Sequence, residues 1–88
     1  MKLIIAIIRD TDNERVSHAL TSKEFRVTCI ASTGGILKKG RSTLLVGVED
    51  DHLDTALEII RNNVTQPSEN DSTRTVLFVV KVDKYIHY

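Results

Sequence analysis

Residues Leu3–Ile8 have the sequence LIIAII, a run in which every side chain is apolar. It is rich in isoleucine, whose branched Cβ favours extended backbone, so the run predicts a β-strand. Successive side chains of a strand point to opposite faces of its sheet. Both faces of this strand are therefore apolar, and the rest of the molecule has to cover two sides.

A helix is expected directly after this strand. Residues 11–14 (Thr-Asp-Asn-Glu) have the spacing of a capping box, in which the first and fourth side chains satisfy backbone amides at a helix start. Val16, Ala19, Leu20 and Lys23 follow at helical spacing, so the helix is predicted over about 12–23.

A second helix is predicted after residue 50, where Asp50 or Asp51 can cap it. Its apolar face has the i, i+3, i+4, i+7 spacing of a helix. The residues of that face are Leu53, Ala56, Leu57 and Ile60. Residues 62–73 are polar and contain the single proline, Pro67, so they are predicted to form a loop.

Three more strands are predicted, over residues 25–32, 43–48 and 75–82. The first alternates between an apolar and a mixed face, and the last is largely apolar on both faces. The order βαββαβ is that of an α+β, ferredoxin-like domain. We therefore expect residues 1–88 to form one domain, a four-stranded antiparallel sheet with two helices on one face.

Two helices can cover only one face of this sheet. The first and last strands are apolar on both faces, so the second face would leave an apolar patch in water, which monomers rarely tolerate. Burying that patch against other copies of the chain provides a large hydrophobic driving force. The sequence predicts a homo-oligomer; the alternative is a two-layer monomer with an apolar outer face.

Composition narrows the class of protein. The 88 residues suit one domain, and 12 basic residues balance 12 acidic ones, which argues against binding a nucleic acid polymer. The single cysteine, Cys29, is predicted to be a core residue; it excludes an intrachain disulfide and indicates a reducing, cytoplasmic location. No apolar run approaches the roughly 20 residues of a membrane-spanning helix, so no membrane partner is expected.

A glycine-rich segment joins the second and third predicted strands. Residues 33–43 contain three of the four glycines, together with Lys38, Lys39 and Arg41. Glycines let backbone amides approach a ligand closely, and concavities of such amides bind anions. The segment suits a phosphate-bearing ligand; the alternative is a hairpin loop with solvated lysines.

Arg26 and Thr28 lie on the mixed face of the strand before this segment. A guanidinium offers a fork of donors to a phosphate or a base edge, and a hydroxyl can pair with a base or a backbone group. The two side chains are candidate ligand-binding residues; the alternative is a surface arginine on a sheet edge.

No catalytic or metal-binding constellation is apparent. His18, His52 and His87 lie on different predicted elements and lack the close spacing of a metal-binding pair. An enzyme of acylphosphatase type would need a basic phosphate loop after the first strand, and residues 9–12 (Arg-Asp-Thr-Asp) are too acidic for one. We expect a binding protein without enzymatic activity, metal or cofactor.

Four stretches carry a resemblance to a known family. They are Met1–Ile8, then Phe25-Arg26-x-Thr28, then Thr33-Gly34-Gly35-x-Leu37-x-x-Gly40 with Thr43 and Gly47-Val48, and the ending Val79-x-x-Val82-Asp83. In these stretches, over nearly its whole length, the chain resembles the PII-like cyclic-di-AMP receptor proteins of Gram-positive bacteria.

The resemblance implies a homotrimer that binds cyclic-di-AMP, or another adenine nucleotide, in clefts between subunits. It implies signalling through loop movements that control an unidentified partner protein. The implied ligand-binding positions are Arg26, Thr28, Gly35, Ile36, Leu37, Arg41, Gly47, Phe78 and His87. The last two would contribute from the C-terminal part of the same or a neighbouring subunit.

Three positions depart from the family's usual pattern. Ile36 stands where a phenylalanine usually packs on adenine, Arg41 where an asparagine is usual, and Glu24 where an asparagine often stands. The loop at 62–73 is also shorter than in typical members. A second interpretation therefore stays open: an interaction module that has lost or altered cyclic-di-AMP binding and regulates a partner protein.

Overall fold

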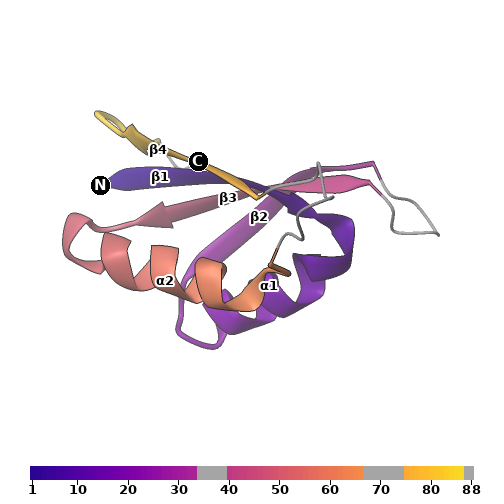
Figure 1. Cartoon of the computed structure of the whole chain (residues 1–88). Helices are drawn as coiled ribbons and strands as arrows, with labels where there is room; N and C mark the ends of the chain where they lie inside the picture. Colours follow the sequence, from indigo (N-terminus) through magenta and orange to yellow (C-terminus); the bar gives the residue numbers. More distant parts are fainter. Residues whose placement is uncertain (34–39, 67–74, 87–88) are drawn as a thin grey trace.

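The computed structural model describes residues 1–33, 40–66 and 75–86, and Figure 1 shows their arrangement. The strands are β1 (Lys2–Arg9), β2 (Arg26–Ser32), β3 (Arg41–Val48) and β4 (Val76–Lys81), and the helices are α1 (Asn13–Thr21) and α2 (Leu53–Asn63). The 3-10 turns η1 (Asp10–Asp12) and η3 (Asp50–His52) precede the two helices. The βαββαβ order predicted from the sequence is confirmed.

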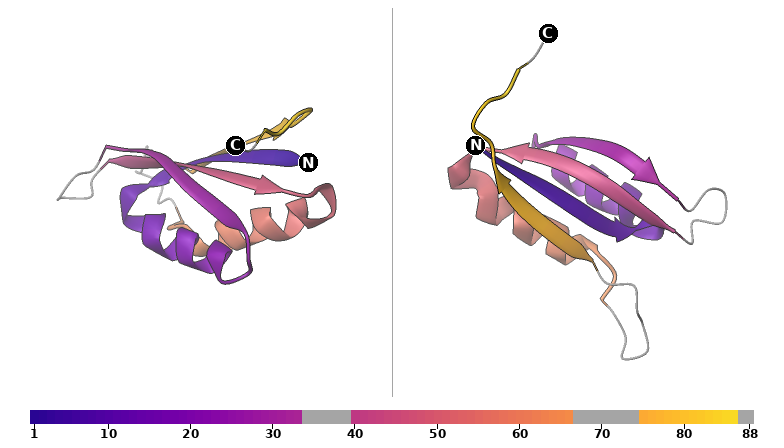
Figure 2. Two further views of the ribbon diagram at one scale, coloured as in Figure 1. Left: turned by 180° about the vertical axis from the view of Figure 1, so that it is seen from behind. Right: turned by 90° about the horizontal axis from the view of Figure 1, so that it is seen from above.

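The four strands form one antiparallel sheet in the order β2-β3-β1-β4 (Figure 2). Both helices lie on the same side of this sheet (Figure 1). The predicted ferredoxin-like α+β fold is therefore confirmed, with β1 in the interior of the sheet and β2 and β4 at its edges. None of the helices in the described part of the chain is long and apolar enough to cross a membrane.

The hydrophobic core lies between the sheet and the two helices. It consists of alternate residues of the two central strands together with one stripe from each helix. These residues are Ile4, Ala6, Ile8, Leu44, Val46, Val48, Val16, Leu20, Ala56 and Ile60, and each is at most 3% exposed. The period-2 alternation of the strands and the helical spacing of α2 place these side chains on the covered face.

The opposite face of the sheet, here called the outer face, carries the other half of the β1 residues. Leu3, Ile5 and Ile7 alternate with the core residues, and strand register places Phe78 and Val80 of β4 on the same face, opposite Ile5 and Leu3. Phe78 is 52% exposed and Val80 44% exposed. No helix of the described chain covers this face (Figure 1), as the sequence analysis anticipated.

The helix starts differ from the predicted ones. The capping box predicted at residues 11–14 is wrong, because α1 begins at Asn13 after η1 and its N-cap residue, Asp12, makes no side-chain capping hydrogen bond. No side-chain cap opens η3 or α2 either. Asp50 instead forms an ion pair with the Met1 amino group at 3.1 Å, and the hydrogen bond from that group lowers the pKa of Asp50.

Other element boundaries shift by a few residues. α1 ends at Thr21 rather than near 23, and α2 continues to Asn63, into the segment predicted as a loop. β3 begins at Arg41, two residues earlier than predicted, because Arg41 pairs with Arg9 at the end of β1. Pairing between distant strands sets this boundary, so local sequence does not reveal it.

The prediction that Cys29 is a core residue is wrong, because Cys29 is exposed. Its position opposite Leu44 places it on the face that bears the helices. However, β2 is an edge strand, and a bulge separates Cys29 from Ala31 in its pairing with β3. The Asn13 side chain of α1 approaches the Cys29 sulfur, with Nδ2 and Sγ 3.7 Å apart, but the helices do not bury it, so a side chain with core periodicity remains accessible.

Candidate functional site

A cavity of about 780 Å³ opens at the end of the sheet where β1 begins and β3 ends. Segments from β1, the α1–β2 turn, β2, β3, the start of α2 and the chain after β4 form its walls. The lining residues are Met1, Lys2, Leu3, Lys23, Glu24, Phe25, Arg26, Thr28, Leu45, Gly47, Val48, Glu49, His52, Thr55, Val82 and Tyr85. A cavity of this volume is in the range that holds small-molecule ligands.

Three of the residues implied by the resemblance meet in this cavity: Arg26, Thr28 and Gly47. Arg26 and Thr28 are two positions apart on β2 and so point to the same face, where they lie opposite Gly47 and Leu45 of β3. Among the described residues, a Cβ atom at Gly47 would meet the Met1 methyl carbon at 3.5 Å, which is ordinary van der Waals contact. Packing within the subunit therefore does not require a glycine there.

The turn that leads from α1 into β2 forms another wall. The backbone N–H of Phe25 donates to the Leu20 carbonyl at 3.1 Å, and that of Glu24 donates to the Thr21 carbonyl at 2.9 Å. These are the two bonds of a Schellman motif, which ends a helix with a left-handed residue. Glu24 is that residue, with φ of 67°. The motif turns the chain so that Phe25 packs against the core beside the cavity.

The charged side chains of the cavity favour an anion by a small margin. Lys2, Lys23 and Arg26 contribute three cations, whereas Glu24 and Glu49 contribute two carboxylates. Apart from these, the walls are largely apolar, with backbone of Gly47 and side chains such as Leu3 and Val82. The arrangement suits a ligand that combines phosphate groups with a flat apolar part.

Three rings also line the cavity, from Phe25, His52 and Tyr85. The Phe25 and His52 rings make an edge-to-face contact, with centroids 6.4 Å apart and planes at 84°. No motif in the sequence marks these three residues as binding positions. They come from three separate segments of the chain. These segments meet because the topology places the start of α2 beside the start of β2, which the local sequence does not reveal.

Two other implied residues that the structure describes, Arg41 and Phe78, do not line the cavity. Arg41 lies at the opposite end of β3, six residues from Gly47, a separation of about 20 Å along a strand. Phe78 is on the outer face of β4, opposite Ile5. Gly35, Ile36, Leu37 and His87 lie outside the described residues.

Polar contacts organise the end of the sheet where Arg41 lies. The Thr33 N–H donates to the Arg41 carbonyl at 2.9 Å, and the Arg41 N–H donates to Thr33 Oγ1 at 2.8 Å. Next to them, the Asp10 carboxylate accepts hydrogen bonds from the hydroxyls of Ser32, at 2.7 Å, and Ser42. These contacts join the end of β2 to the beginning of β3.

The comparisons with known proteins agree with the motifs. A crystal structure of a functionally unknown protein from Pediococcus pentosaceus ATCC 25745 is 27% identical, with a TM-score of 0.77 over 99% of this chain and 96% of that chain. The family model described as "Cyclic-di-AMP receptor" matches residues 1–88, the whole chain. The fold and the cavity lined by Arg26, Thr28 and Gly47 agree with this match, and the chain therefore belongs to the cyclic-di-AMP receptor family.

Proposed function

We propose that this protein is a homotrimeric, PII-like signalling protein that binds cyclic-di-AMP in clefts between subunits and thereby regulates a partner protein. The observation that carries the proposal is the meeting of Arg26, Thr28 and Gly47 in one cavity of a cyclic-di-AMP receptor family member. Arginine and a hydroxyl are suited to phosphate and base recognition, and a glycine backbone permits close approach.

The outer face supports assembly into an oligomer. Leu3, Ile5, Phe78 and Val80 form a continuous apolar surface across β1 and β4, and Phe78 and Val80 each expose more than two-fifths of their area. Contact with neighbouring copies would remove this surface from water, which is the dominant favourable contribution to most protein association. The cavity opens beside Leu3, so a neighbouring copy seated on this face would border it.

The separation of Arg41 from the cavity supports a ligand site shared between subunits. Arg26 and Arg41 lie near opposite ends of the sheet in one subunit, about 20 Å apart along the strand direction. If both contact one nucleotide, they belong to different copies. A cleft between subunits would join the Arg26 end of one copy to the Arg41 end of the next.

Calorimetric titration with cyclic-di-AMP, cyclic-di-GMP, AMP and ATP tests ligand identity. We expect saturable binding of cyclic-di-AMP with one ligand per subunit, and weaker or no binding of the others. The alternative, an interaction module without nucleotide binding, is favoured by Ile36 and Arg41, which replace the family's usual residues. A stable trimer that binds none of the four nucleotides would establish that alternative.

A subunit-mixing experiment tests the shared cleft. The variants Arg26→Ala and Arg41→Ala should each bind poorly alone, because every cleft lacks one arginine. The Arg41→Ala variant keeps Arg26, and the Arg26→Ala variant keeps Arg41. The subunits of a cyclic oligomer meet head to tail, so each cleft has one side from each of two subunits. In an equal mixture that is refolded together, about one cleft in four therefore contains both arginines. Binding restored in the mixture supports the shared site; no restoration would show that the two arginines do not share one ligand.

A further inference from the structure

The ligand cavity needs an aromatic surface if it is to hold a base firmly. Base-on-ring stacking is a general source of nucleotide affinity because every base has a π-face. Segment 34–39 (Gly-Gly-Ile-Leu-Lys-Lys) contains no aromatic residue. A stacking ring for the base must therefore come from another part of the molecule.

Of the three rings that line the cavity, His52 is best suited to this role. Phe25 is half-buried and packs against the hydrophobic core, so much of its ring is already engaged. Tyr85 is 64% exposed and belongs to the chain after β4 rather than to a helix or strand. His52 is exposed, yet it is held at the start of α2.

The contact with Phe25 orients the His52 ring. The two centroids are 6.4 Å apart and the planes are nearly perpendicular, at 84°. An edge-to-face contact uses at most one face of either ring, so the Phe25 contact leaves at least one face of the exposed imidazole uncovered. A ring that is already oriented loses less side-chain freedom when a base binds, which preserves affinity.

His52 and the candidate phosphate-binding residue Arg26 line the same cavity from different sides. Phe25, the contact partner of His52, packs against the core on the helix side of the sheet, whereas Arg26 points to the outer face, opposite Gly47. We propose that His52 is the base-stacking residue of this cavity and makes it selective for purine nucleotides. The inference rests on the proposed nucleotide-binding function and assigns the base to the start of α2, with the phosphates toward Arg26.

Replacement of His52 tests the proposal by calorimetry with cyclic-di-AMP and cyclic-di-UMP. His52→Ala should weaken cyclic-di-AMP binding about five- to 150-fold, the range that corresponds to losing one stacking contact. His52→Phe keeps a ring and should restore binding, whereas His52→Gln keeps hydrogen-bonding capacity without a ring and should not. His18→Ala is the matched control, because His18 is an exposed histidine of α1 outside this cavity.

Two further readouts separate stacking from a structural role. His52→Ala should reduce the preference for cyclic-di-AMP over cyclic-di-UMP, since a purine offers the larger stacking area. A cyclic dinucleotide that carries 2-aminopurine should lose fluorescence on binding to the parent protein and retain more of it on binding to His52→Ala. Circular dichroism of each variant verifies that the fold is intact.

The outcomes distinguish this inference from the proposed function. If the parent binds cyclic-di-AMP and His52→Ala binds it equally well, the stacking assignment is wrong and the receptor function stands. Restoration by His52→Gln but not by His52→Phe would replace stacking by a hydrogen bond and also overturn the assignment. If the parent binds no purine nucleotide, both the function and the inference fail.

Discussion

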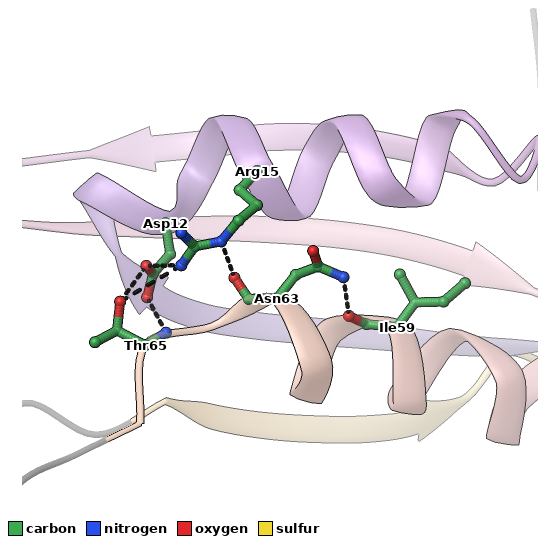
Figure 3. A network of polar contacts seen from close by, with 5 residues as sticks. All are labelled: Asp12, Arg15, Ile59, Asn63 and Thr65. Atoms are coloured by element: carbon green, nitrogen blue, oxygen red, sulfur yellow. Dashed lines mark hydrogen bonds and ion pairs between the residues drawn. The ribbon is translucent and has the colours of Figure 1, made fainter.

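The buried carboxylate of Asp12 accepts two hydrogen bonds from Thr65, 53 residues further along the chain, from the backbone N–H at 2.9 Å and from Oγ1 at 2.7 Å (Figure 3). Arg15 donates to the same carboxylate at 2.8 Å, and its Nε donates to the Asn63 carbonyl at 2.7 Å (Figure 3). The start of α1 is thereby tied to the chain directly after α2. The position of the two helices under the sheet depends on this connection as well as on the core.

Asp12→Ala should lower the free energy of unfolding by about 2–3 kcal/mol, because it removes several charge-assisted hydrogen bonds to a buried carboxylate. Urea denaturation at fixed protein concentration measures the loss. Glu14→Ala is the matched control: Glu14 is an exposed acidic residue of α1, and its removal should change stability by less than about 0.5 kcal/mol. Equal effects of the two substitutions would contradict a structural role for the Asp12 network.

Val80→Asp should prevent the proposed assembly and leave a folded monomer of 9.9 kDa. Val80 is 44% exposed within the subunit, so an isolated subunit can keep the charge in water. In an assembly the same charge would be buried without a partner, at a cost of several kcal/mol. Light scattering and circular dichroism together measure assembly and folding.

Ile8→Asp is the matched control for the outer face. It introduces the same charge on the opposite face of the sheet, where Ile8 is 0% exposed among the core residues, and it should unfold the subunit rather than dissociate it. An oligomer that survives Val80→Asp unchanged would show that the outer face is not the interface.

Gly47→Ala should weaken cyclic-di-AMP binding while leaving stability within about 1 kcal/mol of the parent. The added methyl group finds ordinary contact with the Met1 methyl carbon at 3.5 Å inside the subunit, so the subunit accommodates it. A ligand lying against the Gly47 backbone would be displaced by it. Calorimetry and thermal denaturation of the same sample separate the two effects, and undiminished binding would place the nucleotide away from Gly47.

Glu24→Asn should stabilise the protein by about 0.5–1 kcal/mol. Glu24 occupies the left-handed position of the turn after α1, with φ of 67°, and asparagine adopts this conformation at lower cost than glutamate. Lys23→Asn, one position earlier and outside the left-handed region, is the control and should give no such gain. Thermal denaturation of both variants measures the difference. A loss of stability in Glu24→Asn would mean that contacts of the glutamate side chain stabilise the fold by more than the left-handed backbone destabilises it.

Local periodicity was enough to predict the fold of this protein. The apolar run at Leu3–Ile8, the helical spacing from Leu53 to Ile60 and the alternation after Phe25 each specify an element within a few residues. Their order then leaves few topologies, and βαββαβ is a common one. Of the five implied site residues that the structure describes, Arg26, Thr28 and Gly47 line the cavity, and Arg41 and Phe78 do not.

The tertiary structure decided everything that depends on contacts between distant segments. An alternating strand does not reveal which of its two faces meets the helices; strand register places Ile8 inside and Ile7 outside. A capping motif cannot anticipate that Asp12 binds Thr65 instead, and the period of β2 cannot show that Cys29, on an edge strand, remains exposed. His52 became a candidate because packing brings its ring to Phe25. Sequence patterns record the repeat of a helix or strand, whereas a site forms where separate elements meet in space.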